Sequence, residues 1–526
     1  MAAKTVAVIG AGVSGLTAIK ACLEEGLEPV AFEKRSEIGG LWNYDGFEWT
    51  DSKGPSVYKS LVTNTSKEMQ HFSDFPLPAD CSPYITHQEC LKYLNDYADH
   101  FKLRAYINFN HVITKIEQAS DYDVTGKWRV AYRHDGGEEQ DRVFDYVMIC
   151  TGFFSEARKP SYPGQDAFGG LIIHTNQYRT PDQFIDKNVL VVGESFSAGD
   201  VAVELGFHSK QVYISMREGC FVFPKRGEGG WPLDILTNTR WRFHLPEWLN
   251  RFILQRFIER DVNYDALGLR TKRKLFCSRA IANDFVINQI MHGRVRTRPA
   301  IKRFYHRGVE FVDGTTIDDL DAIVFGTGYA MKTPFIDDSL LSDDLSTREM
   351  YKYVLPVRLK HPTLVCVGFL DVYGALPPVS EMQARWAARV FTGAISLPPL
   401  SAMLGEIEVM RKLMYDRYNK HIIGISPVPY EDNLAADVGC LPTAIGLLSS
   451  DPRLAVHMFL SPGVPATYRL VGPNSWSGAR DAIMKCWENN LTGTKGRVIE
   501  NQRNWSSVYY YVVLVSLLIL IVAYLL

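Results

Sequence analysis

Short runs of apolar residues recur along the chain, and each is followed by glycine, serine or a charged residue. The runs are three to five residues long and are separated by segments of helical length: 6–9, 30–32, 146–150, 189–192, 212–215, 322–325 and 364–367. Continuous apolar runs of this length are typical of strands that are buried on both faces of a parallel sheet. The pattern therefore predicts an α/β fold of the doubly wound type.

Two of these strands lead into a glycine-containing turn and a helix, at Gly10 and at Gly193. They lie too far apart for one dinucleotide fold, so we expect two Rossmann-like domains. Because the segment 321–329 resembles a return to the first domain, the second domain is predicted to be inserted in the first. The predicted boundaries are 1–165 and 321–445 for the first domain, 166–320 for the second with a helical insert near 231–290, and 446–507 for a C-terminal subdomain.

Two further segments raise the question of a membrane. Residues 231–274 are rich in tryptophan, phenylalanine and arginine, which fits either an amphipathic membrane-facing insert or an ordinary helical subdomain. Residues 508–526 carry no charge, and as a helix they would span ~28 Å, close to the ~30 Å of a bilayer core. We expect a C-terminal transmembrane or membrane-anchoring helix, with a buried core helix as the alternative. Because the N-terminal residues run directly into the first predicted strand, we do not expect them to be a signal peptide.

Charge and cysteine usage exclude several classes of function. The 57 basic and 59 acidic residues give a net charge of −2, which does not indicate a nucleic-acid partner. The nine cysteines are scattered without a Cys-x-x-Cys pair. This argues against a disulfide framework, a zinc ribbon and a flavin disulfide reductase, and no metal site is predicted.

The first glycine turn has the spacing G-x-G-x-x-G, formed by Gly10, Gly12 and Gly15. Gly10 permits the tight turn, Gly12 lets a pyrophosphate approach the backbone, and Gly15 lets the helix pack closely on the strand. The pyrophosphate would lie at the helix N-terminus, where unpaired N–H groups favour an anion. The second strand ends in Glu33, a carboxylate suited to ribose hydroxyls and unsuited to a 2′-phosphate. This site is therefore predicted to bind FAD or NAD.

A second segment that would let a ligand approach the backbone closely follows Glu33. Gly40, Leu41 and Trp42 come shortly after it, and glycine beside tryptophan suits a flat, extended ligand. This favours FAD over NAD at the first site.

The second turn contains less glycine. Gly193 begins it, and Ser195 stands where the second glycine would be, so that its Cβ should crowd a pyrophosphate. The next strand ends at Ser215 and is followed by Arg217, and a hydroxyl and a guanidinium suit a 2′-phosphate. NADPH is therefore favoured over NADH, although Glu218 opposes this.

The residues just before the second glycine turn identify a family. Phe168, Gly170, His174, Tyr178 and Arg179 match the motif F-x-G-x-x-x-H-x-x-x-Y-K/R in full. Further matching stretches follow the same order: 58–60, 64–68, 72–76, 150–152, 325–329, 380–386 and 468–473. Over nearly its whole length the chain resembles the animal-type flavin-containing monooxygenases.

The resemblance implies an NADPH- and O2-dependent flavin monooxygenase with FAD. In this family a flavin C4a-hydroperoxide oxygenates soft nitrogen or sulfur nucleophiles, and some relatives insert oxygen beside a ketone. The expected partners are small amines, thioethers or ketones and O2, with a possible homodimer, on the cytosolic face of the endoplasmic reticulum membrane. The alternatives are a Baeyer–Villiger enzyme, an uncoupled NADPH oxidase that releases H2O2, and a non-catalytic nucleotide-binding flavoprotein.

The resemblance also implies roles for individual residues. Asn64 matches the family asparagine that lies near the flavin, and His174 is either an acid–base group or a structural histidine. Thr65, Ser66 and Gln383 match cofactor-binding positions, and Ser197 matches the serine of the family's second glycine turn.

This chain also departs from the family. Ser195 and Phe196 replace a glycine and an asparagine of the second turn, Glu218 replaces an arginine, and Asp371 replaces a glutamine near the substrate. These differences predict weak NADP⁺ retention and more leakage as H2O2.

Overall fold

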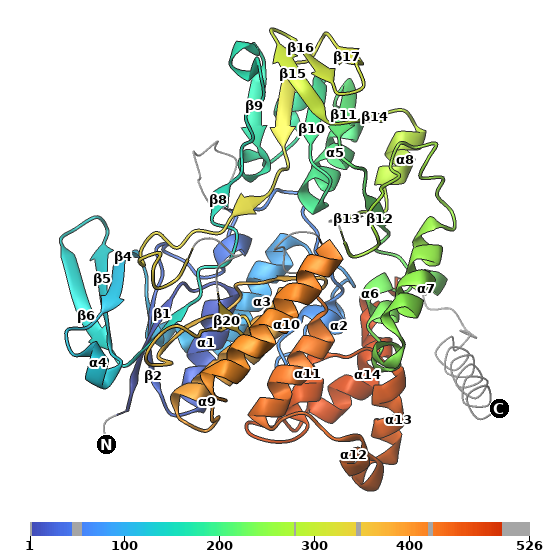
Figure 1. Cartoon of the computed structure of the whole chain (residues 1–526). Coiled ribbons are helices and arrows are strands. Elements are labelled where there is room, and N and C mark those ends of the chain that lie inside the picture. Colours follow the sequence, from blue (N-terminus) through green and yellow to red (C-terminus); the bar gives the residue numbers. More distant parts are fainter. Residues whose placement is uncertain (1–2, 45–54, 278–279, 343–348, 419–423, 497–526) are drawn as a thin grey trace.

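The fold is shown by a computed structural model that describes residues 3–44, 55–277, 280–342, 349–418 and 424–496. Two separate five-stranded parallel sheets organise it (Figure 1). The first sheet has the strand order β22 (Leu364–Cys366), β7 (Tyr146–Ile149), β1 (Thr5–Ile9), β2 (Glu28–Phe32) and β3 (Ile107–Asn108). The second has the order β14 (Val295–Arg298), β11 (Gln211–Ser215), β10 (Asn188–Val192), β18 (Ala322–Phe325) and β9 (Leu171–His174). The predicted α/β class is confirmed.

The apolar runs are continuous because both faces of each sheet are covered. In β1, Val6 and Val8 pack into one core cluster, whereas Ala7 and Ile9 pack into another on the opposite face. In β10, alternate residues likewise enter two different clusters of the second domain. Side chains of a strand alternate between faces, so covering both faces requires apolar residues at every position.

Helices cover the sheets and join the two halves of the first domain. The helix α1 (Val13–Glu24) follows β1 and packs against α9 (Leu376–Phe391), which in turn packs against α11 (Pro427–Val438). In the second domain α5 (Phe196–His208) follows β10 and contacts β11 and α8 (Val286–Met291). The other helices of these domains are α2 (Lys67–Gln70), α3 (His87–His100), α4 (Tyr122–Thr125) and α10 (Leu400–Tyr418).

One predicted boundary is wrong. Ala322–Phe325 was expected to begin the return to the first domain, but as β18 it pairs with β10 and β9 of the second sheet. The return comes only afterwards, where β19 (Tyr329–Ala330) pairs with β8 (Glu156–Ala157) and β22 joins the first sheet. A four-residue apolar run carries no information about which of two parallel sheets it will join.

Smaller sheets complete both domains. An antiparallel sheet of β4 (His111–Gln118), β5 (Trp128–His134) and β6 (Glu139–Phe144) adjoins the first domain, and β15 (Ile301–Tyr305), β16 (Gly308–Phe311) and β17 (Thr316–Ile317) form another beside the second. Three short pairs remain: β12 (Phe221–Phe223) with β13 (Ala280–Ala282), β20 (Met350–Tyr351) with β21 (Leu355–Pro356), and β23 (Asp371–Val372) with β24 (Gly424–Ile425).

The predicted insert is an amphipathic helical segment of the second domain. It contains α6 (Leu233–Thr237) and α7 (Glu247–Glu259). Leu254 and Ile258 of α7 are buried in the second-domain core, while Trp248 and Phe252 are 69% and 54% exposed. The insert thus packs as an ordinary subdomain along one face and leaves aromatic side chains on the other.

The C-terminal helices α12 (Ala444–Ser450), α13 (Pro452–Leu460) and α14 (Ala479–Leu491) lie beside the insert (Figure 1). They share a core cluster with Met69 and Ile235. Within the ranges that the structure describes, none of the helices is both long enough and apolar enough to cross a bilayer. The anchor predicted at 508–526 lies outside the described residues.

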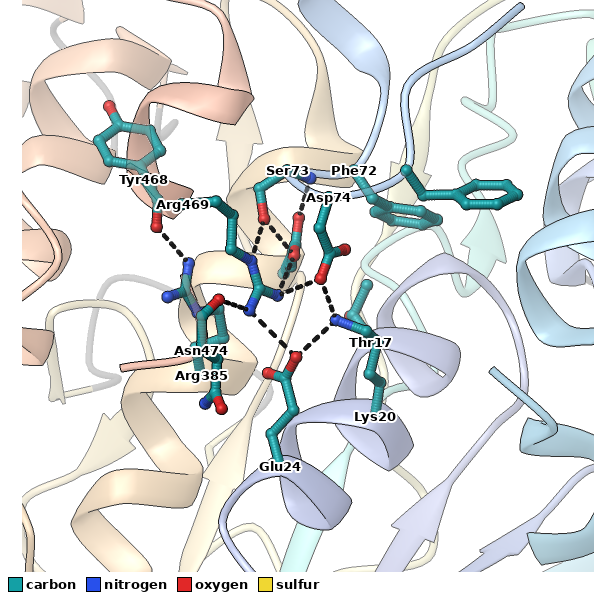
Figure 2. Close-up of polar contacts among 12 residues, drawn as sticks. Thr17, Lys20, Glu24, Phe72, Ser73, Asp74, Arg385, Tyr468, Arg469 and Asn474 are labelled. Atoms are coloured by element: carbon teal, nitrogen blue, oxygen red, sulfur yellow. Dashed lines mark hydrogen bonds and ion pairs between the residues drawn. The ribbon is translucent and has the colours of Figure 1, made fainter. Parts of the chain in front are cut away.

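Several of the stretches that carry the family resemblance meet in one buried ionic network (Figure 2). Arg469, 1% exposed, lies 3.0 Å from Glu24, 3.2 Å from Asp74 and 2.9 Å from Glu381. Lys20 of α1 lies 2.7 Å from both Glu24 and Asp74. The network joins α1, the segment after α2, α9 and the C-terminal subdomain. Those stretches therefore have a structural role.

Candidate nucleotide-binding sites

The first glycine turn joins β1 to α1 and is held by backbone contacts. The Gly10 N–H donates to the carbonyl of Phe32 at the end of β2. Gly10 has φ +103°, a conformation that favours glycine. A Cβ at Gly15 would lie 1.9 Å from the Gly10 carbonyl oxygen, so only glycine lets the helix approach the turn. These two glycines are required by the protein's own backbone.

Gly12 differs from them because it faces Gly40 and leaves room for a Cβ. A Cβ at Gly12 would meet nothing closer than the Cα of Gly40 at 3.5 Å, which is an ordinary contact. The Gly39 N–H donates to the Ala11 carbonyl and so docks the second glycine segment on the first. No acidic residue lies in the first turn of α1. Two facing backbone segments beside a free helix N-terminus fit the diphosphate of a dinucleotide.

Glu33 fixes the geometry of this turn from the end of β2. Its buried carboxylate accepts the Ala11 N–H at 2.8 Å and the Arg35 N–H at 2.9 Å. A carboxylate accepts up to about four hydrogen bonds, so two of its lone pairs stay open to ribose hydroxyls. Leu41 and Trp42 lie in a short 3₁₀ helix and are half-buried beside the turn.

Gln383 has a different position from the other predicted cofactor residues. It is fully buried in α9, its amide oxygen accepts the Gly368 N–H at 2.7 Å, and its amide nitrogen donates to Tyr430 at 2.7 Å. A Cβ at Gly368 would lie 2.3 Å from the Ser14 hydroxyl at the start of α1. In this arrangement Gln383 holds the backbone that packs against the first glycine turn.

The second glycine turn follows β10 with the same backbone plan. The Gly193 N–H donates to the carbonyl of Ser215 at the end of β11, as Gly10 does to Phe32. A Cβ at Gly193 would lie 2.4 Å from the Gly326 carbonyl oxygen, which explains the glycine there. Ser195 is half-buried at the N-cap of α5, and Ser197 is exposed in its first turn.

The side chains at the end of β11 are already engaged within the protein. The Ser215 hydroxyl is buried and donates to the Pro299 carbonyl at 2.7 Å. The Arg217 side chain is 70% exposed and lies 3.7 Å from the carboxylate of Glu194. Glu218 forms an ion pair with Arg273. Two arginines and two carboxylates thus share this edge of the site.

The loop that carries Asn64 is held by two side chains of the second domain. Asn64 is exposed and Thr65 is half-buried. On one side, Lys225 donates to the carbonyls of Val62 and Thr63 at 3.2 and 3.0 Å. The second side chain, Asp234, binds Ser66, which is two residues after Asn64.

Asp234 accepts both the backbone N–H and the hydroxyl of Ser66, at 2.7 and 2.9 Å. Burial raises the pKa of Asp234 to about 6, although the Ser66 hydrogen bonds favour its charged form. Burial also lowers the pKa of Lys225, against the attraction of Asp200. Both side chains thus lie where the second domain contacts this loop.

The identifying motif lies on β9 and the turn after it, where it connects segments. Arg179 is buried and donates to the Ser56 hydroxyl and to the carbonyls of Asn176 and Tyr178. Burial lowers the pKa of His174 to about 4, so its ring is neutral at pH 7. Its Nδ1 accepts the Asn176 N–H and caps the following turn. Among the two readings of His174, this arrangement favours the structural one.

Sequence reasoning missed three residues of these sites. Glu194 stands inside the second glycine turn, and an acid in an anion-binding turn was a signal that could have been used. Lys225 and Asp234 had no such signal, because they lie more than 160 positions from the loop that they hold.

Comparisons with known proteins agree with this geometry. The profile of a family described as flavin-binding monooxygenase-like matches residues 3–526. Flavin-containing monooxygenase 5 of Rattus norvegicus is 37% identical over 538 residues, which cover 100% of both chains. Flavin-containing monooxygenase 2 of Homo sapiens is 37% identical over 531 residues, covering 99% of this chain and 98% of that one.

Solved structures share the fold. The S-allyl-L-cysteine S-oxygenase from Allium sativum aligns with a TM-score of 0.64 and 24% identity, over 94% of this chain and 99% of its own. Cyclohexanone monooxygenase from Rhodococcus sp. Phi1, bound to NADP⁺, aligns with a TM-score of 0.58 and 19% identity, over 83% of this chain and 98% of its own. Identities this low carry the fold alone.

Proposed function

The chain belongs to the flavin-binding monooxygenase-like family and is an oxidoreductase whose cofactors are FAD and NADPH, and from this premise we propose that it oxygenates soft nitrogen or sulfur atoms of small molecules. The observation that carries the proposal is the facing pair Gly12 and Gly40 beside the N-terminus of α1. When bound there, FAD supplies the reaction with dioxygen, and NADPH supplies the electrons.

The chain's own residues position these cofactors. Gly10, Gly12 and Gly15 with Gly39 and Gly40 form the cradle for the FAD diphosphate, and Glu33 would accept the ribose hydroxyls. Three half-buried residues would contact the flavin ring: Leu41, Trp42 and Thr65. The second turn, from Gly193 through Ser197 to Arg217, would hold NADPH.

Asn64 is the residue that we propose to act beside the flavin. A neutral amide donates hydrogen bonds but has no acidic proton to release. At Asn64 it would orient oxygen without protonating it, and this would suppress the loss of oxygen as H2O2. The exposure of Asn64, on a loop that Lys225 and Asp234 hold, supports this role.

One experiment separates the possible reactions. The purified, FAD-loaded full chain is mixed with NADPH, and flavin bleaching, O2 uptake, H2O2 and organic products are followed with a thioether, a tertiary amine and a ketone. We expect sulfoxide and N-oxide formation. Ester formation from the ketone would establish a Baeyer–Villiger enzyme, and H2O2 as the main product would establish an oxidase. FAD binding without O2 uptake would contradict the proposal and leave a nucleotide-binding flavoprotein.

We further propose that residues 508–526 anchor the chain on the cytosolic face of the endoplasmic reticulum membrane. Nineteen uncharged residues, next to Lys495, Arg497 and Arg503, support this. Fractionation of cells that express the full chain or residues 1–507 tests it, and equal partition of the two into membranes would contradict it. The expected homodimer stays a prediction.

A further inference from the structure

Each glycine turn is linked by a carboxylate to the end of the neighbouring strand. The carboxylate belongs to the strand end in the first site and to the turn itself in the second. In the first site, Glu33 at the end of β2 accepts the N–H of Ala11 in the turn. In the second site, Met216 stands at the position that matches Glu33, and Glu194 stands at the position that matches Ala11. The match follows from the hydrogen bonds of Gly10 to Phe32 and of Gly193 to Ser215.

Glu194 reaches out of the turn and caps the chain beyond β11. Its Oε2 accepts the N–H of Arg217 at 3.1 Å and that of Glu218 at 3.4 Å. Its Oε1 lies 3.7 Å from the Arg217 guanidinium, and its side chain is 23% exposed. Consecutive backbone N–H groups that point the same way are natural donors to an anion. Here a carboxylate of the protein already occupies them.

This edge is where a Rossmann domain distinguishes its two nicotinamide dinucleotides. The adenosine ribose lies beside the end of the second strand, where an acid accepts the 2′-hydroxyl of NAD and an arginine binds the 2′-phosphate of NADP. Arg217 is paired with Glu194, and Arg273 with Glu218, so the four side chains sum to no net charge. A 2′-phosphate would meet a neutral edge with its backbone donors taken.

We propose that Glu194 is a specificity-determining residue of the second nucleotide site: it occupies the donors of the 2′-phosphate and thereby weakens the preference for NADP(H) over NAD(H). The inference rests on the proposed function, because it requires the second turn to bind a nicotinamide dinucleotide. It gives a structural cause for the weak NADP⁺ retention that the sequence predicts.

The test measures binding without turnover. Calorimetry on the FAD-loaded full chain compares adenosine 2′,5′-bisphosphate with 5′-AMP, ligands that differ only in the 2′-phosphate. We expect similar Kd values for the parent chain. In Glu194→Gln, which keeps the acceptor oxygen and loses the charge, the bisphosphate should bind about tenfold more tightly, with 5′-AMP changed less than about twofold. Glu194→Ala frees the two N–H groups and should tighten bisphosphate binding further.

Matched controls make the outcome decisive. Glu139→Gln, on β6 of the first domain, removes the same charge and should leave both Kd values unchanged. An unchanged ratio of the two Kd values in Glu194→Gln and Glu194→Ala overturns the role of Glu194 while leaving the second site intact. If neither adenosine ligand binds the parent chain, the assignment of the second site falls and the inference falls with it.

Discussion

The Asp234 carboxylate accepts two hydrogen bonds from Ser66, one from its backbone N–H at 2.7 Å and one from its hydroxyl at 2.9 Å. Asp234 belongs to the insert of the second domain, whereas Ser66 follows the Asn64 loop of the first. Lys225 holds the same loop through the carbonyls of Val62 and Thr63. The position of Asn64 therefore depends on how the two domains pack.

Removing the Asp234 acceptor should loosen the Asn64 loop. Asp234→Ala leaves the N–H and hydroxyl of Ser66 without their partner, and an unsatisfied buried donor costs about 1–3 kcal/mol. Asp234→Asn keeps an acceptor oxygen. We expect Asp234→Ala to lower the Tm and to raise the H2O2 formed per NADPH oxidised, with Asp234→Asn close to the parent. Equal H2O2 yields from the two variants would contradict a positioning role.

Two glycines of the first turn should fail in different ways when they are replaced by alanine. At Gly12 an added Cβ has room within the protein, so Gly12→Ala should fold normally and lose FAD. At Gly15 the Cβ would lie 1.9 Å from the Gly10 carbonyl oxygen, so Gly15→Ala should fail to fold. Gly405→Ala, in open space on α10, is the control. Circular dichroism and the flavin-to-protein ratio measure both effects, and a yellow Gly12→Ala protein would refute the first expectation.

Arg469 is expected to be essential for stability. Arg469→Met would leave Glu24, Asp74 and Glu381 short of a buried cation, and breaking such a network costs about 3–5 kcal/mol. Arg480→Met is the control, because the Arg480–Asp451 pair is largely exposed and is worth about 0–1 kcal/mol. Thermal unfolding should show a large loss of Tm for the first variant only. Similar losses for both variants would show that the burial of the network is unimportant.

The lowered pKa of Glu381 predicts how the stability of the protein depends on pH. Burial disfavours its charged form, but Arg469 and Lys20 outweigh burial and lower its pKa to about 2. The folded pKa lies below the unfolded value of about 4.3, so the contribution to the free energy of unfolding is present above about pH 4.3 and is lost as the pH falls toward 2. Glu381→Gln should lose less stability than the parent as the pH falls from about 4.3 toward 2. If the Tm values of the two proteins fell equally with pH, the result would contradict the lowered pKa of Glu381.

The backbone geometry of the first glycine turn could be predicted from the sequence. Gly10, Gly12 and Gly15 lie within six residues of one another, and their roles follow from backbone sterics that any chain with this spacing obeys. The continuous apolar runs likewise fixed the α/β class, since a strand with both faces covered needs apolar residues throughout.

Only the tertiary structure decided which distant groups meet. Ala322–Phe325 joined the second sheet, the Ser215 hydroxyl was taken by Pro299, and Glu194 turned toward Arg217. The contacts of Asp234 and Lys225 with the Asn64 loop likewise cross from one domain to the other. Periodicity and spacing report interactions over a few residues, whereas these contacts are set by the packing of complete domains. For that reason the sequence predicted the two glycine turns, and the fold determined the side chains that surround them.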